Sequence, residues 1–321
     1  MKSELSKVII GKNELPVTFS FEPENDPDSF IEWFSENRDF VENKLLEVGA
    51  IYFKGTQINT IEDFDKVMKF LTPNAPSFLD GNSPRTKHTS KVYNASEYDA
   101  SAAIHLHTEY SYSKIWPLKI YFCCIKPAAS GGETTVADCR VVLKEIDPDV
   151  VDEFQKKGIS YIRNLHSGQG FGPSWQEAFE TNDKHFMEKY CKENGIQVFW
   201  QKDGSVRLIQ DRPAIRNHPV TGERLWFNQV DQFYPLVYGE EMYQVLMMMS
   251  DNDVDALPMY SRYGDGSEIQ KESIDEIMRV LTKEAIPVPW QRGNLLMVDN
   301  MLALHGRLPY SGERKILAAM G

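Results

Sequence analysis

The feature that most constrains this chain is a set of three potential metal ligands divided between two distant segments. His107-Thr108-Glu109 places an imidazole and a carboxylate two residues apart, and His305 follows far downstream. Side chains alternate along an extended segment, so His107 and Glu109 point to the same side and can bind one ion. Two imidazoles and one carboxylate can cover one face of Fe(II) and leave three positions open. The chain must therefore fold so that a distant strand brings His305 to the other two residues.

The segments around these residues strengthen the interpretation, because an H-x-E triplet alone can arise by chance among seven histidines and 47 acidic residues. Residues 116–125 are apolar, aromatic and branched, as in a buried strand. In residues 127–135, two glycines allow a sharp turn, and hydroxyl side chains that can bind a carboxylate follow. Residues 289–300 form a second turn and strand that lead toward His305. These patterns indicate a β-rich core around the proposed ligands.

Taken in order along the chain, these segments resemble the TauD/TfdA family of Fe(II)/2-oxoglutarate-dependent oxygenases. The glutamate of the H-x-E triplet, with residues 226–229 and 263–266, resembles the SyrP-type branch, whose members resemble hydroxylases of amino acids in natural-product pathways. The family elements are His107-Thr108-Glu109, Gly131-Gly132-Glu133-Thr134, His218-Pro219-Val220-Thr221-Gly222-Glu223, Asn300-Met301-Leu302-Ala303-Leu304-His305-Gly306-Arg307 and the strand of Arg314.

The resemblance implies a mainly β fold with helical decorations (α+β), built on a double-stranded β-helix, or jelly roll, that carries the iron at one open end. We expect one domain over residues 1–321, with helical insertions near 140–195 and 239–285. A chain of 321 residues is long for one domain, yet decorated β cores reach this size as single units.

The resemblance also implies the ligand set His107, Glu109 and His305. His105 is the main alternative, because it lies two residues before His107 and would share its side of a strand. The family places the first ligand immediately before x-[DE], so we select His107. A cupin-like site would use both histidines, but it would need a glutamate further along the chain than Glu109.

Arg314 is our prediction for the residue that binds the C5 carboxylate of 2-oxoglutarate, because a guanidinium can form two parallel charge-assisted hydrogen bonds. Lys315 is the alternative, since neighbouring strand residues face opposite sides and the register of this strand is not evident from sequence. Thr134 matches the hydroxyl that contacts the same carboxylate in the family. Arg307 either forms a structural ion pair or lines the pocket.

The candidate substrate contacts are Asn94, Ser96, Tyr110 and Arg212, which lie where relatives touch substrate or where a cation could hold a substrate carboxylate. A surface salt bridge is the ordinary role of such an arginine.

The expected reaction is hydroxylation of an unactivated C–H bond in an amino acid or amino-acid-derived molecule, free or tethered to a carrier protein, with release of succinate and CO2. Related halogenases lack the carboxylate ligand, so Glu109 favours an oxygen-derived product. The remaining alternatives are a zinc hydrolase and a binding module without turnover.

Composition narrows the classes of partner. A formal charge of −12 disfavours nucleic acids and anionic lipid surfaces as partners, because both require a cationic face. The chain has no apolar run of about eighteen residues and no signal-like N-terminus, so we expect a cytoplasmic enzyme. Two of the four cysteines, Cys123 and Cys124, are adjacent in a predicted strand and cannot easily bridge, so we expect reduced thiols. The sequence leaves open whether the protein is a homo-oligomer.

The remaining pattern predicts helices and strands between the site segments. Residues 75–100 are rich in turn-forming and polar residues and are expected to form an exposed connection over the site. The expected helices span residues 28–48, ending at Gly49, and residues 61–71, 147–158, 176–195, 239–250 and 267–285, and the expected strands span residues 50–55, 198–200 and 224–227.

Overall fold

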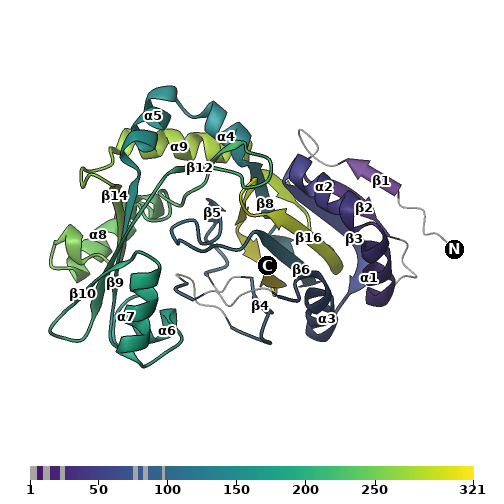
Figure 1. The fold of residues 1–321 in the computed structure, drawn as a ribbon, viewed down its shortest axis with the longest axis horizontal. Helices are drawn as coiled ribbons and strands as arrows, with labels where there is room; N and C mark the ends of the chain where they lie inside the picture. Colours follow the sequence, from purple (N-terminus) through teal and green to yellow (C-terminus); the bar gives the residue numbers. More distant parts are fainter. Residues whose placement is uncertain (1–5, 10–14, 22–25, 75–78, 82–85, 96–97) are drawn as a thin grey trace.

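A computed structural model describes residues 6–9, 15–21, 26–74, 79–81, 86–95 and 98–321. Two β-sheets form its centre (Figure 1). The larger has the strand order β1-β2-β3-β16-β6-β19-β4, and the smaller has the order β15-β8-β17-β5. Both sheets contribute to one core, which includes Ile120, Phe122 and Leu296 from the larger sheet and Val136 and Leu304 from the smaller. The expected class, a jelly roll with helical decorations, is confirmed.

The strands of the two central sheets have the following bounds. The larger sheet contains β1 (Ser6–Ile9), β2 (Val17–Ser20), β3 (Ala50–Ile58), β4 (Tyr93–Asn94), β6 (Lys119–Lys126), β16 (Gly293–Asp299) and β19 (Lys315–Met320), and the smaller contains β5 (Ile104–His107), β8 (Thr134–Asp138), β15 (Ile286–Val288) and β17 (Ala303–Arg307).

Alternation along β6 divides its side chains between two cores. Phe122 and Cys124 face the core between the sheets, whereas Tyr121 and Cys123 face the helices on the outer side of the larger sheet. Those helices are α1 (Pro27–Glu36), α2 (Arg38–Val48) and α3 (Ile61–Leu71), seen beside β3 in Figure 1. All four cysteines of the chain are buried free thiols, as expected.

Local signals explain where these helices begin and end. The expected helix over residues 28–48 is two helices, because the side-chain amide of Asn37 donates to the carbonyl of Trp33 at 2.9 Å and ends the first one. Gly49 ends α2 with a φ of 83°, a conformation that favours glycine. A Cβ at Gly49 would also lie 3.3 Å from the Cβ atoms of Leu302 and Ala303. The corner between α2 and β3 can therefore pack directly against the start of β17.

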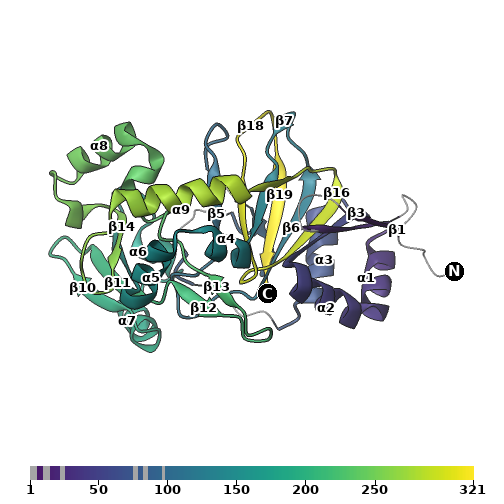
Figure 2. The same ribbon diagram turned by 90° about the horizontal axis from the view of Figure 1, so that it is seen from above.

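A third antiparallel sheet, called the outer sheet here, lies away from α1–α3 at the opposite end of the molecule (Figures 1 and 2). Its strand order is β10-β11-β9-β14. The outer sheet contains β9 (Ile159–Leu165), β10 (Gln197–Trp200), β11 (Val206–Arg212) and β14 (Met259–Tyr263). The structure also contains the hairpin of β12 (Ile215–Asn217) and β13 (Arg224–Trp226) and the ribbon of β7 (Ser130–Gly131) and β18 (Tyr310–Ser311). Further helices are α4 (Cys139–Glu145), α5 (Pro148–Lys157), α6 (Trp175–Ala178), α7 (Lys184–Glu193), α8 (Glu240–Met249) and α9 (Lys271–Glu284), with short 3-10 helices η2 (Pro235–Tyr238) and η3 (Val254–Ala256).

Most of the expected helices and strands are present with small shifts at their ends. Besides the helix expected over residues 28–48, the helix expected over residues 176–195 is also divided in two, into α6 and α7. Glu180 adopts a left-handed φ of 49° after α6, and the side chain of Asp183 then caps α7 by accepting from two backbone N–H groups. Among the described residues, no helix is long and apolar enough to cross a membrane.

Candidate metal centre

His107 and His305 lie directly opposite each other on the paired strands β5 and β17. The nearest carboxylate oxygen of Glu109 is 3.6 Å from Nε2 of His107 and 3.8 Å from Nε2 of His305. Two atoms bound to one ion at about 2.1 Å can be at most about 4.2 Å apart. One atom from each of the three residues lies within 4.8 Å of the others, and His105 does not belong to this group. This donor set can hold one divalent ion and suits Fe(II).

The orientation of His107 is set by its own strand. Its Nδ1 lies 2.9 Å from the carbonyl oxygen of His105, to which an Nδ1–H donates. The lone pair of the neutral ring is then on Nε2, the nitrogen that faces Glu109. The same carbonyl of His105 accepts from the side chain of Gln232 at 3.3 Å. The backbone of His105 therefore orients the proposed first ligand.

Asn300 holds the backbone of Glu109 from the distant turn before β17. Its side-chain oxygen accepts from the Glu109 N–H at 2.7 Å, and its amide donates to the Glu109 carbonyl at 2.8 Å and to the Pro117 carbonyl at 2.9 Å. Asn300 is fully buried. Sequence analysis placed Asn300 in a family element without assigning it a contact, because its partner is 191 positions away.

Thr108, between two of the proposed ligands, is held from the segment after β13. Its carbonyl accepts from the side chain of Gln229 at 2.5 Å, and its hydroxyl donates to the carbonyl of Asn228 at 3.4 Å. Asn228 is in turn anchored to the carbonyl of Ala214 at 2.9 Å. Within residues 226–229, Asn228 and Gln229 therefore support the segment of the proposed ligands. Sequence analysis had used these residues only for the resemblance to the SyrP-type branch.

A cavity of about 410 Å³ opens beside the three proposed ligands and contains Thr134 and Arg314 in its wall. The Arg314 Nε–H donates to the carbonyl of Gly132 at 2.9 Å, and the Thr134 hydroxyl oxygen accepts from the Trp290 indole at 3.0 Å. Burial lowers the pKa of Arg314 to about 10, so the guanidinium stays charged at neutral pH. Lys315 is not part of the cavity wall. The side chains of Arg314 and Thr134 are thus placed where an anionic co-substrate could bind.

Two ionisable groups near the proposed ligands are strongly affected by burial. Burial raises the pKa of Asp231 to about 7, and an electrostatic interaction with His107 opposes this shift. Burial also lowers the pKa of His105, and the neighbouring His107 adds to the effect. His105 lines the cavity. Sequence analysis missed Asp231, which has no recognisable motif around it.

Arg307 lines the cavity and also supports the loop at its edge. Its Nη2 donates to the carbonyl oxygens of Asp99 at 2.7 Å and Ala102 at 2.6 Å. The loop residues Tyr98, Asp99 and Ala102 form part of the cavity wall. The expected connection over the site is thus present in its described part, and Arg307 holds it through backbone carbonyls.

The three candidate substrate residues that the structure describes, Asn94, Tyr110 and Arg212, each have different contact partners. The side chain of Asn94 contacts Nε2 of His88 at 2.7 Å, and Tyr110 is buried with its ring stacked 5.8 Å from that of Tyr112. Arg212 donates to the carbonyls of Asp211 and Asn194, each at 2.9 Å. None of these three residues lines the cavity, and Ser96 lies outside the described residues.

Another part of the cavity wall comes from the outer sheet and its connections. Sequence analysis missed these residues, because they belong to insertions whose position over the site depends on tertiary packing. This part includes Asn164, Leu165, Phe171, Met242, Leu246 and Met259.

Comparisons with known proteins agree with this geometry. A family model described as "Taurine catabolism dioxygenase TauD, TfdA family" matches residues 13–320. The dapdiamide synthesis protein DdaC of Enterobacter agglomerans is 37% identical over 292 residues, which cover 91% of this chain and 87% of that protein. A clavaminate synthase-like protein of Arabidopsis thaliana is 27% identical over 299 residues, with the same coverages of 91% and 87%.

Solved structures share the fold at low sequence identity. PvcB of Pseudomonas aeruginosa superposes with a TM-score of 0.53 at 13% identity and covers 99% of this chain and 90% of its own. AAD-2, solved in complex with Mn(II) and N-oxalylglycine, gives a TM-score of 0.53 at 13% identity, with coverages of 99% and 96%. At this identity the likeness establishes a common fold.

Proposed function

Because the chain belongs to the TauD/TfdA family of Fe(II)/2-oxoglutarate-dependent dioxygenases, we propose that it hydroxylates an unactivated C–H bond of an amino acid or amino-acid-derived substrate. The products from the co-substrate are succinate and CO2. His107, Glu109 and His305 hold the iron, and Arg314 and Thr134 bind the C5 carboxylate of 2-oxoglutarate. The observation that supports this assignment is that all five residues line one cavity.

The iron, with 2-oxoglutarate and dioxygen, supplies the oxidising chemistry that couples decarboxylation of the co-substrate to oxygenation of a C–H bond. The chain contributes position, charge and exclusion of water. Asn300 and the carbonyl of His105 orient two of the proposed ligands. Arg314 supplies a partly buried cation, which pairs with an anionic co-substrate more strongly than a fully exposed cation would.

A small-molecule substrate is supported by the size of the cavity, because ligand sites of this kind span about 300–1,000 Å³. The similarity to DdaC, named as a dapdiamide synthesis protein, supports an amino-acid-derived substrate in specialised metabolism. We also propose that the chain belongs to the SyrP-type branch, because Glu109 stands where other members have aspartate. The substrate is either a free molecule or a group tethered to a carrier protein.

Anaerobic titration of the metal-free protein with Fe(II) and then 2-oxoglutarate tests the proposed chemistry. Chelation of the metal by the keto acid produces a weak visible charge-transfer band. We expect the band in the wild-type protein and its loss in His107→Ala, which removes one of three ligands.

His105→Ala is the matched control, because its ring lies outside the ligand group and its carbonyl, which orients His107, is retained. We expect this variant to keep the band. Loss of the band in both variants would favour the cupin-like arrangement, because that site uses both histidines. Tight metal binding without a band in the wild-type protein would contradict the use of 2-oxoglutarate. Screening amino acids for substrate-stimulated succinate release then identifies the substrate class.

A further inference from the structure

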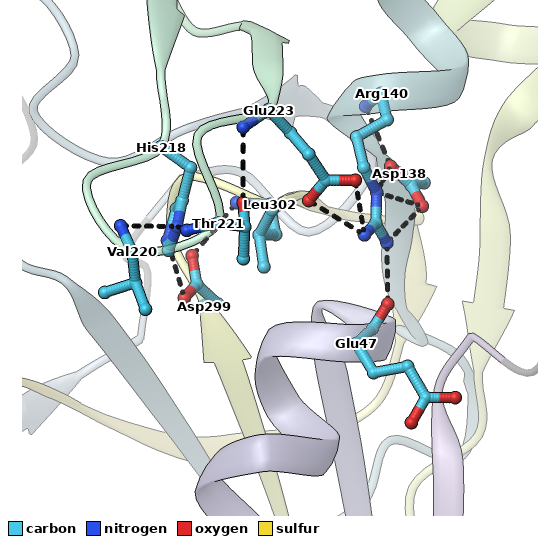
Figure 3. Close-up of polar contacts among 9 residues, drawn as sticks. All are labelled: Glu47, Asp138, Arg140, His218, Val220, Thr221, Glu223, Asp299 and Leu302. Carbon is cyan, nitrogen blue, oxygen red and sulfur yellow. Dashed lines mark hydrogen bonds and ion pairs between the residues drawn. The ribbon is translucent and has the colours of Figure 1, made fainter.

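The family element of residues 218–223 lies outside the cavity wall and needs a separate explanation. It forms the turn between β12 and β13, closed by hydrogen bonds from the His218 N–H to the Glu223 carbonyl and from the Gly222 N–H to the His218 carbonyl, both at 2.9 Å. His218 is 4% exposed. Figure 3 shows its ring pointing from this turn toward Asp299, at the end of β16.

The hydrogen bonds of His218 define its tautomer. Nδ1 accepts from the backbone N–H groups of Val220 at 3.3 Å and Thr221 at 3.1 Å, so this nitrogen carries no proton. The proton of the neutral ring is then on Nε2, which donates to Oδ2 of Asp299 at 3.3 Å. One side of the ring closes its own turn, and the other side reaches a different strand.

Asp299 shapes the segment that follows β16, which we call the ligand turn (residues 299–302). Its Oδ1 accepts from the N–H groups of Met301 at 2.9 Å and Leu302 at 3.0 Å. Its own N–H donates to the carbonyl of Gly49 at 2.9 Å. Because the two carboxylate oxygens serve different partners, the orientation of Asp299 links His218 to the conformation of the ligand turn.

The ligand turn is connected to both parts of the proposed metal site, by hydrogen bonds to Glu109 and by the chain that continues to His305. Asn300 holds the backbone of Glu109 through two hydrogen bonds, at 2.7 and 2.8 Å. Leu302 leads directly into β17, which presents His305 two residues after it starts. A displacement of the ligand turn would therefore change the position of Glu109 relative to His305.

A second contact fixes the same hairpin to the smaller sheet (Figure 3). Arg140 lies 3.4 Å from both carboxylate oxygens of Glu223 and donates to Asp138 at 2.7 Å and to the carbonyl of Glu47 at 3.0 Å. Asp138 is opposite Ala303 in the pairing of β8 with β17. The hairpin is thus attached on both sides of the ligand turn, so His218 can act as a fixed support.

We propose that His218 is a positioning residue that, through Asp299 and the ligand turn, sets the placement of Glu109 relative to His305. This inference rests on the proposed function, because it assumes that these two residues are metal ligands. It predicts that the Nε2 side of His218 controls metal affinity, whereas its Nδ1 side serves only the local turn.

Two substitutions separate the sides of the ring. In His218→Asn the side-chain oxygen can replace Nδ1 as the acceptor for the turn, but no donor reaches Asp299. In His218→Gln the longer amide can replace Nε2 as the donor to Asp299, but the acceptor for the turn is lost.

The measurement is the affinity for Co(II), from its absorption spectrum, in the full-length metal-free protein without 2-oxoglutarate or oxygen. We expect His218→Asn to bind Co(II) about 10-fold or more weakly, the usual effect of losing a group that orients a ligand. His218→Gln should stay close to the wild-type protein.

Thr56→Val controls for general loss of stability. Thr56 is fully buried, and its hydroxyl donates to the carbonyl of Gly293 at 2.6 Å, at the opposite end of β16 from Asp299. This variant should lower the thermal transition and leave Co(II) affinity unchanged.

Equal Co(II) affinities of the two His218 variants, or weaker binding by His218→Gln than by His218→Asn, would overturn the inference. A Thr56→Val variant that loses as much affinity as His218→Asn would also overturn it, because the effect would then follow stability. If Co(II) binding by the wild-type protein does not depend on His107, the proposed function itself fails, and that result is distinct from the others.

Discussion

Arg314 carries a partly buried positive charge at the proposed co-substrate end of the cavity. Each hydrogen bond to a charged group contributes about 1.5–3 kcal/mol. We therefore predict that Arg314→Leu weakens 2-oxoglutarate binding about 100-fold or more. Arg314→Lys should give an intermediate loss, because an ammonium retains the charge but not the planar pair of donors. Calorimetric titration of the Co(II)-loaded variants with 2-oxoglutarate measures both effects.

Lys315→Leu is the control for this prediction, because it removes a cation at the adjacent position outside the cavity wall. Its affinity for 2-oxoglutarate should match that of the wild-type protein. A larger loss in Lys315→Leu than in Arg314→Leu would assign the carboxylate to Lys315 instead.

The raised pKa of Asp231 leads us to predict that the stability of the metal-free protein depends on pH. Burial raises its pKa to about 7 in the folded state, whereas an unfolded aspartate has a pKa of about 3.9. Between these values the folded state binds a proton that the unfolded state has released. The contribution of Asp231 to the free energy of unfolding therefore falls as pH rises from about 4 to about 7 and is constant above that.

Asp231→Asn removes this contribution. Relative to the wild-type protein, the variant should gain up to about 4 kcal/mol in unfolding free energy between pH 4 and pH 8, since each pKa unit corresponds to about 1.36 kcal/mol. Urea unfolding of both proteins across this pH range gives the difference. Parallel pH profiles for the two proteins would contradict a raised pKa for Asp231.

At the scale of elements, the turn between β7 and β8 holds Arg314 in place. Gly132 has a φ of 76°, and a Cβ there would lie 3.0 Å from Cδ and Nε of Arg314. We predict that Gly132→Ala lowers both stability and 2-oxoglutarate affinity. Stability falls by about 1–2 kcal/mol, because alanine is unfavourable in the left-handed backbone conformation. The affinity for 2-oxoglutarate falls because the added Cβ displaces the Arg314 guanidinium.

Gly266→Ala separates the two effects. Gly266 has a φ of 86°, but apart from its two chain neighbours no atom of the described residues lies within 4 Å of an added Cβ. Thermal unfolding should show comparable destabilisation of the two variants, whereas titration with 2-oxoglutarate should show a loss only in Gly132→Ala. Equal affinities would mean that the turn does not control Arg314.

Elements with strong local signals were predicted well from the sequence. The helix expected over residues 61–71 is α3, because Thr60 and Asp63 form a capping box at its start. The helix boundaries that were missed depend on single polar residues. Asn37 and Asp183 can be accommodated in a helix or can end and begin one, and their hydrogen bonds with nearby backbone groups decide between these outcomes.

At the scale of the whole molecule, a buried ion pair joins the outer sheet to the rest of the chain. Arg163 on β9 pairs with Asp80, and both side chains are almost completely buried. The carbonyl of Asp80 accepts from the hydroxyl of Tyr112 at 2.9 Å, and its N–H donates to the carbonyl of Ala178 at 2.8 Å. Tyr112 lies three residues after Glu109, so the pair links the outer sheet to the segment of a proposed ligand.

Arg163→Met should cost about 3–5 kcal/mol in unfolding free energy, because it leaves the carboxylate of Asp80 buried without its cation. Adding Asp80→Asn should recover part of this loss. Denaturant unfolding of the two single variants and the double variant measures their coupling. Strictly additive losses would show that the pair contributes no interaction energy.

The H-x-E spacing, the distant histidine and the order of the glycine-rich and arginine segments were sufficient to identify a resemblance to the TauD/TfdA family, and that resemblance implied the fold class and the reaction class. The motifs could be identified because they depend on residue order and on alternation along strands, which are visible in the sequence. Sequence chemistry favoured Arg314 over Lys315, but the strand register that places Arg314 in the cavity wall was not evident from the sequence. The hydrogen bonds of Asn300 to Glu109, the burial of Asp231 and the part of the cavity wall from the outer sheet were also not predictable in this way. Each depends on contacts between segments far apart in the chain, and such contacts exist only after the sheets have packed together.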